Sequence, residues 1–103
     1  MSQSNQSRLA LVAADGHELT PREVRTGLHA ALSGHPISSR EDLPKITVRV
    51  RNELEQRNWG AIVIERVVDH IDDLIDLPAS VVARRTTLAP QFRDTIQSIF
   101  LAG

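Results

Sequence analysis

The sequence predicts an all-α fold, a small bundle of four or five helices, with one short N-terminal strand as an open alternative. Three stretches repeat apolar side chains at intervals of three and four residues, which places them on one helix face. One of these stretches opens with a complete helix start signal, and Gly34 and Pro78 follow two of them. With 103 residues the chain has the length for one hydrophobic core. We therefore expect a single helical domain over residues 9–103.

The N-terminus is polar before the domain begins. Residues 1–8 predict a flexible tail. Residues 9–14 are apolar, but the run is too short for periodicity to separate a strand from a helical turn. Asp15 and Gly16 then predict a turn.

The first predicted helix spans residues 21–33. Thr20 is placed to be its N-cap, Pro21 its first residue and Glu23 its third, which together make a capping box. Gly34, followed closely by a proline, ends the helix.

The second predicted helix spans residues 44–58. Residues 45–51 alternate apolar and polar side chains, as a strand does, and this alternative stays open. Ile46, Val50 and Leu54 are also spaced four apart, and this stripe persists after the alternation has ended at Asn52. The longer pattern favours a helix.

The third predicted helix is the central one, over residues 61–76. Apolar residues recur along one face and acidic residues occupy the other, although three acids in its last turn oppose the helix dipole. A short helix follows over residues 78–85. Pro90 begins the last helix, with apolar positions at Phe92, Ile96, Ile99 and Phe100.

Composition argues against several functional classes. Twelve basic and 13 acidic residues give a net charge of −1, so no bulk field favours nucleic acid or a membrane surface. There is no Cys, no secretory signal and no apolar run long enough to span a bilayer, so a cytoplasmic location is expected. Phosphate-loop, nucleophile-elbow and metal-ligand spacings are missing, and the four histidines show no ligand spacing. We expect neither an enzyme nor a cofactor or metal site.

The positive functional signal is a surplus of apolar side chains. Three clusters place apolar residues on consecutive positions, and neighbours on a helix point about 100° apart, so one small core cannot easily bury them all. Leftover apolar surface usually marks an interface. The residues expected to bind a partner are Ile62, Val63, Val82, Phe100 and Leu101. The sequence thus predicts a small regulatory or adaptor protein that binds another protein as a homodimer, for example an anti-activator sequestering a transcription factor.

An alternative function comes from a resemblance. The stretch that begins at residue 24 contains SSREDL at residues 38–43, followed by ITVRVRNELEQRNW at residues 46–59. This text resembles the helix-turn-helix of winged-helix repressors, which carry a similar T-V-R with N-E-L-E on the groove-reading helix. The resemblance implies a DNA-binding transcriptional repressor using residues 24–58, with Thr47, Arg49 and Asn52 facing DNA.

Overall fold

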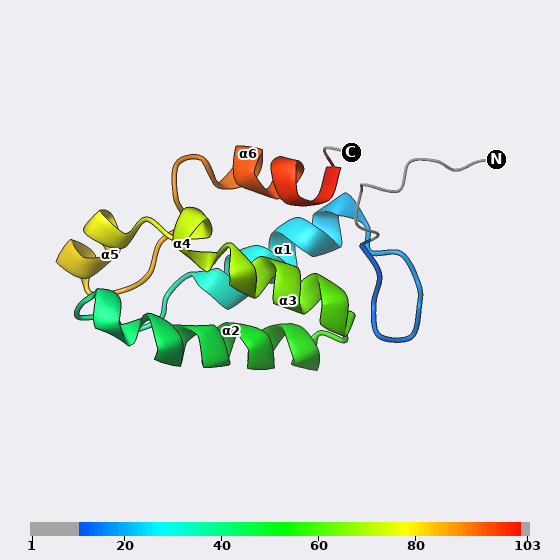
Figure 1. The fold of residues 1–103 in the computed structure, drawn as a ribbon, viewed down its shortest axis with the longest axis horizontal. Coiled ribbons are helices and arrows are strands. Elements are labelled where there is room, and N and C mark those ends of the chain that lie inside the picture. The colour runs from blue at the N-terminus through cyan, green and yellow to red at the C-terminus, as the bar shows by residue number, and fades with distance from the viewer. Residues whose placement is uncertain (1–10, 102–103) are drawn as a thin grey trace.

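The computed structural model describes residues 11–101, and the side chains of residues 11–99. The prediction of an all-α fold is confirmed: this part of the chain forms six α-helices and no β-sheet (Figure 1). The predicted tail at residues 1–8 lies outside the described residues. The helices are α1 (Pro21–Leu32), α2 (Leu43–Gln56), α3 (Ala61–Asp69), α4 (Ile71–Leu74), α5 (Leu77–Ala83) and α6 (Phe92–Ile96). A 3₁₀ turn, η1 (Arg40–Asp42), precedes α2, and a π-helical turn, η2 (Gln97–Leu101), follows α6.

Helix α1 begins at the predicted capping box. The Thr20 backbone N–H donates to Glu23 Oε1 at 2.8 Å, and the Glu23 N–H donates to Thr20 Oγ1 at 3.1 Å. These bonds satisfy two of the N–H groups that a helix start leaves unpaired. The helix ends at Leu32, and Gly34 turns the chain with a φ of +83°.

Residues 45–51 are helical, so the strand alternative is wrong for them. Helix α2 buries Leu43, Ile46, Val50 and Leu54, which form the predicted stripe. It packs against both α1 and α3, and α2 and α3 run side by side in opposite directions (Figure 1).

The predicted central helix over residues 61–76 is divided in two. Helix α3 ends at Asp69, His70 leaves the helical conformation with φ −113° and ψ 21°, and α4 begins at Ile71. The break takes these acids out of the last turn of a long helix, because Asp72 and Asp73 lie in the single turn of α4. Asp76 becomes the N-cap of α5 and accepts from the Ala79 N–H at 3.5 Å.

The segment before α1 is held by backbone bridges, not by a named strand. Val12 pairs with Glu18 across the predicted turn at Gly16, whose φ is +97°, and Ala13 pairs with Trp59. The Trp59 side chain is buried and lies against Gly27, so this pairing connects the N-terminal segment to α1. Leu9 and Ala10, the start of the apolar run, lie outside the described residues.

Two connecting loops hold the end of the bundle near α5. The Gly34 N–H donates to the Thr86 carbonyl at 2.8 Å, and the Thr86 N–H donates to the His35 carbonyl at 2.9 Å. The buried Thr86 hydroxyl also accepts from the His35 N–H at 2.9 Å. The chain after α5 is therefore fixed against the chain after α1, and it then leads directly into α6.

Within the described residues, every helix is too short or too polar to cross a lipid bilayer.

Candidate functional site

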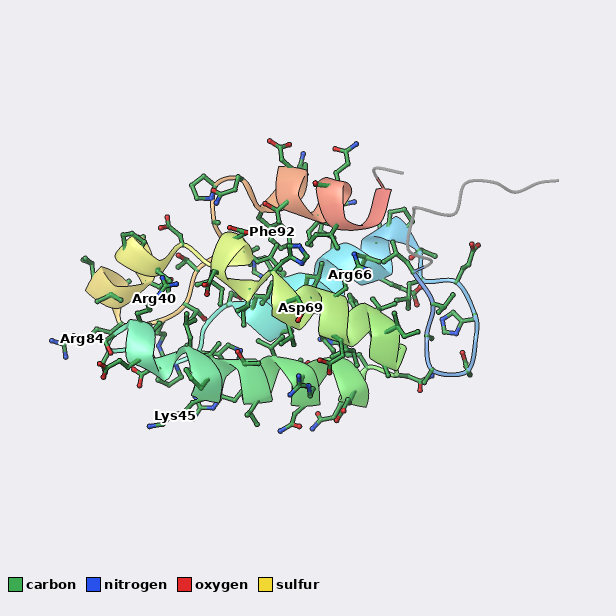
Figure 2. All side chains as sticks on the ribbon, in the orientation of Figure 1. Arg40, Lys45, Arg66, Asp69, Arg84 and Phe92 are labelled. Carbon is green, nitrogen blue, oxygen red and sulfur yellow. The ribbon has the colours of Figure 1, made fainter. Side chains whose placement is uncertain are left out.

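An apolar groove of about 540 Å³ lies between α1 and α6 and is open on one side. Most of its lining is aliphatic or aromatic, so it offers a partner apolar contact. Figure 2 shows Phe92 on the side of α6 that faces the bundle, where it is half-buried against the core. The apolar lining residues are Leu11, Leu19, Pro21, Val24, Leu28, Leu88, Phe92 and Ile96.

The two helical walls present the same pattern. Each contributes two apolar side chains spaced four residues apart, Val24 and Leu28 from α1 and Phe92 and Ile96 from α6. Side chains at this spacing lie one above the other on a helix face. The α1 pair is buried, whereas Phe92 and Ile96 are half-buried. The α6 wall therefore retains apolar surface exposed to solvent.

Helix α6 is fixed by its connection to α4. The Ala89 N–H donates to the Leu74 carbonyl at 2.9 Å, and Ile75 forms a bridge with Leu88. The Asp76 N–H donates to the Thr87 carbonyl at 2.9 Å. These bonds hold the start of α6 over α4 and place Leu88 in the groove lining.

The far end of the groove is set by the segment before α1. The Leu19 N–H donates to the Leu11 carbonyl at 2.8 Å, which keeps both side chains at the groove. The groove is thus bounded by backbone-bonded segments as well as by the two helices.

The polar residues that line the groove are basic or neutral. They are Arg25 and His29 on α1 and Arg93 and Gln97 on α6, and all four are exposed. Each follows directly after one of the paired apolar residues, so the polar set forms a rim along both walls. No Asp or Glu lines the groove among the described residues. The ion pairs of the described residues involve other bases, namely His17, Arg40, Arg51 and Arg57.

Of the residues expected to bind a partner, the three whose side chains are described, Ile62, Val63 and Val82, do not come together. Ile62 and Val82 are exposed, at 70% and 85% of their surface. They lie in the first turn of α3 and near the end of α5, at opposite ends of the bundle (Figure 1). Val63 is fully buried, so its expected place on a partner surface is wrong: α3 turns this side chain into the core beside Ile64.

The last two expected partner residues are Phe100 and Leu101. Both fall in η2, and their side chains lie outside the described part of the structure.

The residues implied to face DNA lie on α2. Arg49 and Asn52 are exposed and Thr47 is half-buried. The connection from α1 to α2 spans residues 33–42, longer than the turn of about three or four residues in a helix-turn-helix. The hairpin wing of a winged helix has no counterpart after α2 in the described chain, because α3 begins at Ala61.

A second, more polar cavity of about 400 Å³ lies between α3–α4 and α6–η2. Its residues include a histidine, two carboxylates and two hydroxyls, the side-chain types used in acid–base chemistry. The ring of His70 is bonded through Nδ1 to the Arg66 carbonyl at 3.0 Å. No hydrogen bond joins that ring to a cavity hydroxyl or carboxylate within the described residues. The lining residues are Arg66, His70, Asp73, Asp94, Thr95, Ser98 and Ile99.

Two carboxylates with shifted pKa lie outside both cavities. The backbone N–H and then the ring of His17 hold the pKa of Asp15 below its usual value. The Ser38 N–H, donating to Asp42 Oδ2 at 2.7 Å, does the same for the pKa of Asp42. Both carboxylates order turns. Among the residues described, no cluster of three His, Cys, Asp or Glu side chains is arranged to hold a metal ion.

Comparison of the chain with known protein families, curated proteins and solved structures finds no match.

Proposed function

We propose that this protein acts by binding another protein, as a small non-enzymatic regulator or adaptor, and that the α1–α6 groove holds the partner. The observation that carries the proposal is the half-buried pair Phe92 and Ile96 on one wall of an apolar groove of about 540 Å³. Apolar surface that a folded monomer leaves in a concave site is typical of an interaction site.

The groove has enough apolar lining to hold a partner by burial. Two partner side chains of leucine size, fully buried, contribute roughly 3–6 kcal/mol before the costs of association are subtracted. Because association itself costs at least about 4 kcal/mol, a partner segment needs more than two such anchors, or polar contacts at the groove as well, to bind stably. An antagonist that sequesters a transcription factor by occupying one of its helices is one role of this kind.

The test compares two full-length variants as bait in pull-downs from the source cell. Ile96→Asp places a charge in the groove, and Val48→Asp places the same charge on an exposed site of α2. We expect a protein retained by the native chain and by Val48→Asp to be lost with Ile96→Asp. Circular dichroism must show the same helical content for all three. Retention unaffected by Ile96→Asp would contradict the groove as the binding site.

The expected homodimer remains a prediction and has its own test. Ile62 and Val82 are two of the three large apolar residues that are exposed in the described chain, the third being Val48. If Ile62 and Val82 meet a second copy, sedimentation of the native chain gives twice the monomer mass, and the double variant Ile62→Ser/Val82→Ser gives the monomer. A native chain that stays monomeric at every concentration would refute the dimer.

DNA binding is the second candidate function. It is favoured by the exposed basic and amide side chains of α2, Lys45, Arg49 and Asn52. A DNA-binding chain is retained on heparin and loses affinity steeply as salt rises. Retention that falls in the variant Arg49→Ala would support this candidate, and passage through the column at low salt would count against it.

A further inference from the structure

We propose that the groove receives an amphipathic helix of a separate protein, with acidic residues flanking the apolar stripe of that helix. This inference rests on the proposed function, because it names the chemistry of the partner segment at the same groove.

The walls of the groove favour a partner segment that is helical over one that is an extended strand. Both are built from helices, whose backbone groups are bonded within the helix, so neither offers the open sheet edge that an added strand requires. An extended segment in an apolar groove would leave its own N–H and C=O groups unpaired. A helix satisfies those groups internally.

The spacing of the walls also suits a helix. Val24 and Leu28 on α1, like Phe92 and Ile96 on α6, are four residues apart, which is about 6 Å along the axis. A partner helix that carries anchors at i, i+4 and i+7 presents apolar side chains at a matching interval.

The basic rim of the groove favours acidic residues on both sides of the partner helix's apolar stripe. Arg25 lies on the α1 wall and Arg93 on the α6 wall, so each side of a seated helix meets a guanidinium group. No carboxylate of the described chain lines the groove to oppose or neutralise these groups. Glutamate and aspartate pair with arginine through bidentate hydrogen bonds, whereas lysine there would be repelled.

A second copy of this chain does not offer such a helix in its described residues. Its large exposed apolar side chains, Val48, Ile62 and Val82, lie on three different helices and form no stripe. The acidic segment of α3 and α4 turns its stripe inward, with Ile64, Val67, Ile71 and Leu74 buried. The described residues of a second copy therefore supply no helix that fits the groove, which favours a separate polypeptide as the partner.

The test uses two synthetic helical peptides with the same leucine stripe, one flanked by glutamates and one by lysines. Binding to the full-length protein is followed by fluorescence anisotropy at low and high salt. We expect the Glu peptide to bind about tenfold more tightly than the Lys peptide, with a difference that shrinks as salt rises. The double variant Arg25→Glu/Arg93→Glu should reverse the preference.

The matched control is Lys45→Glu/Arg49→Glu on α2, which changes the net charge equally and should leave the preference in place. Ile96→Ser should weaken both peptides. If both peptides bind equally and Ile96→Ser weakens them, the acidic flank is refuted while the protein-binding groove stands. If Ile96→Ser changes neither affinity, the groove itself is refuted as the site.

Two further outcomes would assign the groove to another occupant. A self-association that Ile96→Ser abolishes would show that a second copy fills the groove. A gain in peptide affinity of about tenfold in the variant Leu9→Asp would show that the chain's own N-terminal segment does. Either result overturns the inference of a separate partner.

Discussion

Gly27 and Trp59 provide a sharp test of the packing that places α1. A Cβ built at Gly27 would lie 2.7 Å from Cζ2 and 3.2 Å from Cε2 of the Trp59 ring. Carbon atoms in contact sit about 3.5–4.0 Å apart, so the substitution Gly27→Ala requires the ring to move. The ring is only 4% exposed, and the surrounding core resists that movement.

Two opposing effects determine how much Gly27→Ala changes the free energy of unfolding. Alanine is about 1 kcal/mol better than glycine inside a helix. Overpacking a buried site costs about 1–3 kcal/mol, and a contact this short belongs at the upper end of that range. The free energy of unfolding should therefore fall by about 1–2 kcal/mol, although helix propensity alone predicts a rise.

The assay is urea unfolding, followed by the fluorescence of Trp59, the one tryptophan of the chain, and by circular dichroism. Ala30→Gly, at an exposed position of the same helix, measures the propensity effect separately. In a Trp59→Phe background the ring is smaller and Gly27→Ala should lose its penalty, with unfolding followed by circular dichroism alone because no tryptophan remains. Equal or greater stability of Gly27→Ala in the native background would refute the reasoning.

Three further predictions concern buried, titratable and exposed positions. Thr86→Val removes the hydroxyl that accepts from the His35 N–H at 2.9 Å. The free energy of unfolding, measured in urea, should fall by about 1–3 kcal/mol. An unchanged unfolding midpoint would show that another acceptor replaces the hydroxyl. Asp42 has a lowered pKa in the folded state, so its contribution to stability is present above its unfolded pKa of about 3.9 and is lost as the pH falls through the folded value. The difference in melting temperature between the native chain and Asp42→Ala should therefore be constant near neutral pH and shrink below about pH 4, and a difference independent of pH would contradict this. Ile62→Ser and Val82→Ser should each change the stability of the monomer by less than about 0.5 kcal/mol in urea, and a larger loss would mean that these side chains are buried.

The sequence predicted the helices whose signals are local. Helix α1 was predicted over 21–33 and spans Pro21–Leu32, because Thr20 and Glu23 form the capping box from neighbouring residues alone. Helix α2 was predicted over 44–58 and spans Leu43–Gln56, because its stripe outlasts the alternation.

The break at His70 had no comparable local signal. Neither Gly nor Pro marks it, and the apolar stripe continues across it. The break is accompanied by contacts with distant residues, since Leu74, Ile75 and Asp76 bond to the chain at 87–89. The one indication in the sequence was the dipole conflict of the acids, which a division into shorter helices resolves.

The groove could not be predicted from the sequence either, because it depends on contacts between residues that are distant in the chain. The apolar positions Phe92 and Ile96 were visible as a stripe, but their half-burial depends on where α6 lies relative to α1. Nothing in the sequence distinguishes Arg25 and Arg93, because basic residues on exposed helix faces are common. A repeated pair of an apolar residue followed by an arginine, on two helices, becomes meaningful only once those helices face each other.

The most direct test of the binding groove is chemical-shift mapping of the ¹⁵N-labelled chain during titration with the glutamate-flanked peptide. Amides of α1 near Arg25 and of α6 near Arg93 should shift in proportion to occupancy, while those of α2 near Arg49 stay in place. Shifts confined to α2, or none at saturating peptide, would contradict a partner site between α1 and α6.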